Sequence, residues 1–145
     1  MALTKKISQI LFLSHLKRFD DATLFLMRLL IGVFLIWGVA DHLFNSGKMT
    51  EFEGFLRQFE FYQPSFISRV SIWLQFFVGL SFVLGLFTRW AGVLCTLNFM
   101  IALIMVNGAH GIRAVFPAII LVLIGLYLAT KGGGRYSLDK VIFNQ

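Results

Sequence analysis

Hydrophobic stretches dominate the chain, and four of them have lengths that fit a lipid bilayer. Apolar residues run with few interruptions through 22–40, 68–87, 90–106 and 113–130. A helix needs about 20 residues to cross a hydrocarbon core about 30 Å thick. Helices also satisfy their own backbone hydrogen bonds in lipid, where water is absent. The pattern therefore predicts four membrane-spanning helices.

The connections between these stretches predict how the helices are arranged. Residues 88–89 and 107–112 make two short connections, whereas 41–67 makes a long one. Short connections place consecutive helices side by side and antiparallel. No repeat, low-complexity tract or linker divides the sequence. We therefore expect an all-α polytopic membrane four-helix bundle that forms a single domain over 1–145.

The long connection has a helical periodicity of its own. In "KMTEFEGFLRQFEFYQP" the apolar positions recur at i, i+3, i+4 and i+7, and they are Phe52, Phe55, Leu56 and Phe59. Charged residues occupy the positions between them. This pattern predicts an amphipathic helix at the outer membrane interface, or over the mouth of the bundle. Pro64 is expected to begin the second spanning helix, where its missing N–H costs nothing.

The first 21 residues have the features of a basic surface segment. Lys5 and Lys6 precede a short apolar stretch that ends at "KRFDD", and no small-residue cleavage site is present. A signal peptide is therefore the weaker interpretation. We expect an amphipathic N-terminal helix over 1–21 whose lysines meet anionic lipid head groups.

Composition and charge support the membrane assignment and predict an orientation. Apolar residues make up 58% of the chain and charged residues 14%, against about 45–50% and about 25% in soluble proteins. If both termini are cytoplasmic, that side carries eight basic residues outside the spans: Lys5, Lys6, Lys17, Arg18, Arg89, Lys131, Arg135 and Lys140. The other side carries four: Lys48, Arg57, Arg69 and Arg113. The excess predicts cytoplasmic termini.

The same residues exclude several classes of function. The net charge of +6 does not form a basic stripe with interleaved aromatics, so nucleic-acid binding is not expected. Cys95 is the one cysteine, which excludes an internal disulfide or a CxxC redox centre. No HxxxH or ExxH spacing supports a haem or metal site. Redox chemistry would therefore need a bound cofactor or another subunit.

Polar and small residues inside the spans follow helical stripes. A polar group in hydrocarbon costs free energy unless it faces the bundle interior. One face of the second span carries Ser68, Ser71, Gln75 and Gly79. One stripe of the first span carries Arg28, Gly32, Leu35, Val39 and His42. Both stripes are predicted to point inward, with Gly32 allowing a neighbouring helix to approach closely.

Depth in the membrane separates the polar residues into two layers. Arg28 and Asn98 form an inner, structural layer, in which Asn98 is the predicted hydrogen-bond partner of Arg28. Alternatively, Arg28 snorkels or binds backbone carbonyls. The outer layer predicts a ligand-binding pocket open to the outer face, formed by His42, Gln75, Asn107 and His110. Alternatively, His42 and His110 lie at the membrane interface without binding a ligand. The phenylalanines would then contact lipid instead of lining a groove for a quinone-like ligand.

Three segments in a fixed order resemble the DoxX family of small bacterial membrane proteins. They are "GVADHLF" at the end of the first span, "GLSFVLGLFTRWAG" between the second and third, and "GRYSLD" after the fourth. The resemblance covers about 24–139. In the last segment, the glycines at 132–134 are expected to stop the helix, with Lys131 and Arg135 at the cytoplasmic interface and Tyr136 at head-group depth. Ser137 and Asp139 are expected to cap the C-terminal residues after them.

The resemblance implies a function. Family members are similar to the membrane subunit of thiosulfate:quinone oxidoreductase, and others are associated with oxidative-stress complexes. We therefore expect a subunit of a quinone-linked oxidoreductase or redox-associated complex in the bacterial inner (cytoplasmic) membrane. The outer pocket would bind the quinone, and a protein partner or further copies of the chain would complete the complex, since the chain has no cofactor fingerprint for catalysis alone.

The sequence departs from the family pattern at one position, Gln75, and an alternative function stays open. The family often has an acidic residue at the position of Gln75, and glutamine cannot ionise there. The alternative function is a non-catalytic membrane scaffold or anchor, or a protein that binds or transports a small solute.

Overall fold

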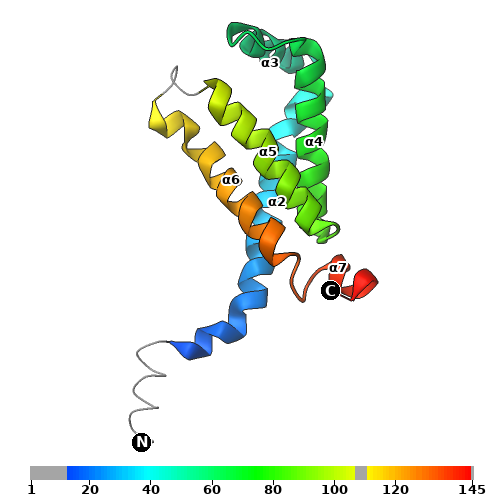
Figure 1. The fold of residues 1–145 in the computed structure, drawn as a ribbon. Helices are drawn as coiled ribbons and strands as arrows, with labels where there is room; N and C mark the ends of the chain where they lie inside the picture. The colour runs from blue at the N-terminus through cyan, green and yellow to red at the C-terminus, as the bar shows by residue number, and fades with distance from the viewer. Residues whose placement is uncertain (1–12, 107–110, 145) are drawn as a thin grey trace, which may run out of the picture.

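The computed structural model describes residues 13–106 and 111–144, and this part of the chain is helical, without strands (Figure 1). The elements are the 3₁₀ helix η1 (Ser14–Phe19) and the α-helices α2 (Asp20–Phe44), α3 (Ser46–Gln58), α4 (Pro64–Leu84), α5 (Thr88–Val106), α6 (Ile112–Lys131) and α7 (Leu138–Phe143). Four of them, α2, α4, α5 and α6, are long and apolar enough to span a membrane. The predicted all-α polytopic fold is confirmed. Most of the predicted N-terminal helix, including Lys5 and Lys6, lies outside the described residues.

The spanning helices pack as two close pairs, α2 with α4 and α5 with α6. A Cβ atom on Gly32 would lie 2.7 Å from the carbonyl oxygen of Gly79 across the first pair. A Cβ atom on Gly92 would lie 2.6 Å from the carbonyl oxygen of Gly125 across the second. Glycine therefore lets the backbones touch in both pairs. In Figure 1 the ends of α4 and α5 lie close together near α7 and separate toward α3.

The core lies between the two pairs, and the outer surface is apolar. The buried core cluster includes Leu35, Phe82, Cys95 and Leu128. Large apolar side chains such as Trp37 and Phe77 are exposed. An exposed apolar surface of this extent is typical of helices in contact with lipid. We call the end of the bundle with the α4–α5 turn and the last residues of α6 the basic end, and the opposite end the α3 end.

The turn between α4 and α5 differs from the prediction. Residues 88–89 were expected to connect the helices, but α4 ends at Leu84 and α5 already begins at Thr88. Gly85 has a φ of 68° and ends α4 in the left-handed region, which glycine adopts without strain. The turn therefore occupies 85–87. Pro64 begins α4, as expected.

The predicted amphipathic helix of the long connection is present as α3. The side chain of Asn45 accepts a hydrogen bond of 2.9 Å from the N–H of Gly47 and caps the helix. Leu56 is buried, and Ser65 of α4 donates a hydrogen bond of 2.9 Å to Glu53. These contacts hold α3 across one end of α4 (Figure 1). Its position at the outer membrane interface stays a prediction.

Candidate functional site

The residues predicted to form the outer pocket are only partly within the described structure. Asn107 and His110 lie outside the described residues. His42 sits near the end of α2, with its ring edge-on to Phe52 at a centroid distance of 5.7 Å. Its Nδ1 atom is buried and has no hydrogen-bond partner among the described residues. His42 and Gln75 share no hydrogen bond, so convergence of the predicted pocket stays a prediction.

Gln75 instead begins a chain of hydrogen bonds that joins α4 to α5. Its Nε2 atom donates to Ser71 Oγ at 3.2 Å, and Ser71 Oγ donates to Asn98 Oδ1 at 2.9 Å. The stripe on α4 therefore faces the bundle interior and reaches Asn98. Asn98 was predicted to pair with Arg28, and this prediction is wrong because Arg28 donates to the carbonyl oxygen of Tyr136, while the Asn98 oxygen accepts from Ser71. The amide nitrogen of Asn98 has no hydrogen-bond partner in the described part of the chain.

A cavity of about 310 Å³ lies beside Asn98, lined by residues of α3, α4, α5 and the loop between α3 and α4. Its volume reaches the range of about 300–1,000 Å³ that is usual for ligand pockets. Ser71 and Asn98 are its polar lining residues, and none of its lining residues carries a charge. The apolar lining consists of Phe52, Phe55, Leu56, Phe61, Phe66, Ile67, Val70, Leu74, Leu94, Leu97, Ile101 and Ala102. We call this the phenylalanine cavity.

Sequence reasoning found the parts of this cavity but not their combination. The periodicity of α3 identified Phe52 and Phe55, and the helical stripe on α4 identified Ser71. Asn98 was assigned to a structural layer with Arg28. Its depth in α5 could be read from the sequence, but the register of α5 against α4 could not, and that register decides which partner Asn98 meets.

Arg28 is fully buried at the basic end. Its Nη2 atom donates a hydrogen bond of 2.6 Å to the carbonyl oxygen of Tyr136. Its Nε and Nη1 atoms have no hydrogen-bond partner among the described residues. The guanidinium carbon lies 5.8 Å from the ring centroid of Phe25, within the range of a cation–π contact. Arg28 therefore binds a backbone carbonyl of the C-terminal segment, and a snorkelling side chain is excluded by its burial.

The segment "GRYSLD" folds back onto the basic end. Both carboxylate oxygens of Asp139 accept hydrogen bonds from the backbone, from Phe87 N at 2.6 Å and from Thr88 N at 2.8 Å. The N–H of Asp139 donates to the carbonyl oxygen of Gly85 at 2.9 Å. Ser137 accepts from Lys140 N at 3.3 Å and caps α7, as predicted. Asp139 was expected to cap the C-terminal residues as well, but it caps α5.

Ion pairs fasten the same segment to the start of α2. Lys131 Nζ lies 2.8 Å from Asp20 Oδ2, and Arg135 Nε lies 3.9 Å from Asp21 Oδ2. The N–H of Arg135 also donates to Asp21 at 3.3 Å. Exposed pairs of this kind contribute little free energy each. They nevertheless bring carboxylates and cations from both ends of the chain to one place.

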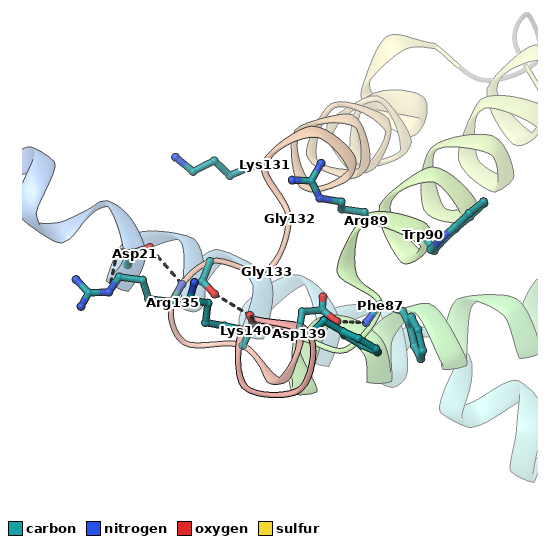
Figure 2. Close-up of a pocket in the computed structure, with 13 residues that line it drawn as sticks. Asp21, Phe87, Arg89, Trp90, Lys131, Gly132, Gly133, Arg135, Asp139 and Lys140 are labelled. Atoms are coloured by element: carbon teal, nitrogen blue, oxygen red, sulfur yellow. Dashed lines mark hydrogen bonds and ion pairs between the residues drawn. The ribbon is translucent and has the colours of Figure 1, made fainter. Parts of the chain in front are cut away.

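A second cavity, of about 560 Å³, opens at the basic end beside the folded-back segment (Figure 2). Its charged lining residues are Asp21, Arg89, Lys131, Arg135, Asp139 and Lys140. Its other lining residues are Phe87, Trp90, Gly132, Gly133, Gly134, Ser137 and Phe143. We call this the basic cavity. It was not predicted, because its walls come from α5, from the end of α6 and from the C-terminal segment.

Comparison with known proteins identifies a family. The family model of DoxX matches residues 23–108, which is more than half of the chain. No curated protein and no solved structure gives a significant match. The matched residues include the whole lining of the phenylalanine cavity and end before α6.

Proposed function

This chain belongs to the DoxX family, and from that premise we propose that it is the membrane subunit of a quinone-linked oxidoreductase or redox-associated complex. The ligand we assign to it is a quinone-like molecule in the phenylalanine cavity. One observation supports this above the others. The amide nitrogen of Asn98, at the wall of an apolar cavity, has no hydrogen-bond partner among the described residues.

The lining of the cavity suits a neutral ring with a carbonyl group. Phenylalanine side chains offer apolar contact to a ring and its tail. The amide N–H of Asn98 would donate a hydrogen bond to the carbonyl oxygen. Ser71 and Gln75 hold the Asn98 side chain in place from its other end. A charged ligand would lose its hydration there without gaining a counter-charge.

Electron transfer is assigned to a partner of this chain. Cys95 is a buried free thiol, and no group of three or more His, Cys, Asp or Glu within the described residues could hold a metal ion. The role proposed for this chain is to bind the quinone, to orient its carbonyl and to exclude water from it. The partner would supply the electrons.

Replacing Asn98 by leucine tests the proposed site. Leucine has the same branched shape as asparagine but cannot donate, so a quinone carbonyl in the cavity would lose its hydrogen bond. We expect binding of decylubiquinone, a short-chain benzoquinone, to weaken about tenfold, which corresponds to about 1.4 kcal/mol. Equilibrium titration of purified protein in neutral detergent measures the affinity. Met100→Leu, on the exposed face of the same helix, should bind like the wild type.

Two results would contradict the quinone site. One is equal affinity of Asn98→Leu and the wild type for decylubiquinone. The other is wild-type protein that neither retains a quinone nor binds decylubiquinone, while a partner protein co-purifies with it. The second result would favour the scaffold alternative, because a scaffold needs a partner and no ligand.

We also propose that both termini are cytoplasmic in the bacterial inner membrane, which places the phenylalanine cavity toward the outer face. Support comes from the basic end, where Arg89, Lys131, Arg135 and Lys140 gather around one cavity. A reporter protein fused after Gln145 should be active only as a cytoplasmic fusion. A fusion active only in the periplasm would reverse the orientation and place the cavity on the cytoplasmic side.

A further inference from the structure

The basic cavity has no role in the proposed quinone chemistry. It lies at the opposite end of the bundle from the phenylalanine cavity, and the two share no lining residue. Its volume of about 560 Å³ is within the usual range for ligand pockets. Four basic and two acidic side chains line it. The excess of basic side chains favours a negatively charged ligand.

The acidic side chains around the cavity are already occupied. Asp20 pairs with Lys131, and Asp21 pairs with Arg135. Asp139 accepts the N–H groups of Phe87 and Thr88. These carboxylates compensate Lys131 and Arg135 but leave the other two basic residues without a counter-charge.

Arg89 and Lys140 are those two residues. Neither makes an ion pair or a side-chain hydrogen bond with any residue in 13–106 or 111–144. Both line the cavity. Two unpaired cations on the wall of one cavity attract an anion, and an arginine fork suits the oxygens of a phosphate.

The Arg89 guanidinium lies close to the backbone at the end of α6. Arg89 extends from the first turn of α5 to the chain reversal after α6 (Figure 2). Gly132 has a φ of 82°, and a Cβ atom there would lie 3.2 Å from Arg89 Nε. Glycine thus gives Arg89 room to lie against the end of α6. The guanidinium therefore lies beside the end of α6 and is exposed to a ligand.

The cavity also has an apolar part. Phe87, Trp90 and Phe143 line it and are 55%, 70% and 48% exposed. Tryptophan is enriched at the level of lipid head groups. Charged and aromatic side chains in one cavity match an amphiphile, whereas a small inorganic anion would contact only the charged ones. The cavity lies at the ends of α5 and α6, which are long and apolar enough to span a membrane, and head groups are expected at the ends of such helices.

We propose that the basic cavity binds one anionic phospholipid. Its phosphate contacts Arg89 and Lys140, and its glycerol and upper acyl carbons lie against Phe87 and Trp90. A free phosphate shares the first set of contacts but not the second. The lipid is therefore the proposed source of the phosphate, and this site is independent of the quinone site.

Native mass spectrometry of the full chain in neutral detergent tests the site. Phosphatidylglycerol, phosphatidylcholine and inorganic phosphate are added separately. We expect one phosphatidylglycerol to be retained, with about tenfold lower retention of phosphatidylcholine, whose choline places a positive charge beside Arg89. The double variant Arg89→Gln, Lys140→Gln should lower phosphatidylglycerol retention about tenfold, because both phosphate contacts are lost.

The control removes the same charge from the other end of the bundle. Arg57→Gln with Arg113→Gln replaces two exposed basic residues that line neither cavity. It should retain phosphatidylglycerol like the wild type. Circular dichroism checks that both double variants keep their helical content, which is expected because all four residues are exposed.

Three outcomes would count against the proposal. Equal retention of phosphatidylglycerol by the Arg89, Lys140 variant would remove the site. Equal loss in the Arg57, Arg113 control would show a general charge effect. Retention of inorganic phosphate that depends on Arg89 and Lys140, without preference for phosphatidylglycerol, would support the phosphate contacts and overturn the lipid as their source.

Discussion

Replacing Gly85 by alanine is expected to lower the free energy of unfolding by roughly 2–5 kcal/mol. The left-handed backbone at this position costs a non-glycine residue about 1–2 kcal/mol. The new Cβ atom would also overlap Arg28 Nη1 and lie 2.7 Å from Ser137 Cβ. Arg28 is fully buried, so relief requires displacement of the C-terminal segment, at about 1–3 kcal/mol for overpacking.

A glycine in open surroundings provides the control for Gly85. Gly38 lies in α2, where an added Cβ would have no atom within 4 Å apart from the backbone of its own helix and its chain neighbours. Gly38→Ala should leave stability unchanged or raise it by up to about 1 kcal/mol, because alanine favours a helix more than glycine does. Thermal unfolding in detergent, followed by circular dichroism, measures both variants. Equal melting temperatures for Gly85→Ala and the wild type would contradict the contact with Arg28.

The sequence predicts most of the fold because a membrane restricts the structures that a chain can adopt. Each spanning helix must be long and apolar, and its polar groups must face inward. The predicted inward stripe of α2 illustrates this. Four of its five members, Arg28, Gly32, Leu35 and Val39, are buried in the structure, and the fifth, His42, is half-buried. Hydrophobic length and helical period were sufficient to identify the helices and their inner faces.

Contacts between distant segments could not be predicted in the same way. Arg28 and Tyr136 are separated by 108 positions, and Asp139 caps a helix that begins 51 positions earlier. Neither contact can be recognised from the residues near it in the sequence. Every residue has a backbone carbonyl and nearly every residue has a backbone N–H, so the residue type does not identify which one forms the hydrogen bond. The glycines at 132–134 were read as a stop signal. In the structure they also turn the chain back under α5.

In the candidate ligand site, too, the features within one helix could be predicted and the contact between two helices could not. The helical period predicts that Ser71 faces inward and that Phe52 lies on the apolar face of its own helix. Asn98 needed the register of α5 against α4, which depends on the crossing point at which the helices pack. The hydrogen bond from Ser71 to Asn98 fixes that register, and it moves Asn98 from the predicted structural pair to the wall of the phenylalanine cavity.

Arg28 connects three parts of the basic end. Its Nη2 atom binds the Tyr136 carbonyl, and its Nη1 atom lies against Gly85 in the α4–α5 turn. The Asp139 carboxylate attracts its charge while accepting the first N–H groups of α5. The C-terminal segment is therefore held by a buried cation on α2 and holds α5 in turn. Weakening this attachment should release the segment before the bundle unfolds.

Replacing Arg28 by leucine is expected to release the C-terminal segment. The Tyr136 carbonyl loses a hydrogen bond from a charged donor, worth about 1.5–3 kcal/mol. Cleavage through a transiently open state follows the free energy of opening, so trypsin should cut after Arg135 and Lys140 roughly 10- to 150-fold faster. Arg28→Lys should fall between leucine and the wild type, since lysine keeps the charge without the planar fork. Mass spectrometry of the fragments measures each site.

Two comparisons separate release of the segment from general unfolding. Cleavage after Arg57 at the α3 end should keep its wild-type rate, because the hydrogen bond removed lies at the basic end. A double-mutant cycle with Asp139→Asn should give less than the sum of the two single effects, since the carboxylate and the guanidinium attract each other. Additive effects would show that Arg28 and Asp139 act independently. Equal acceleration after Arg57 and Arg135 would show that Arg28 stabilises the whole bundle and not the attachment of this segment.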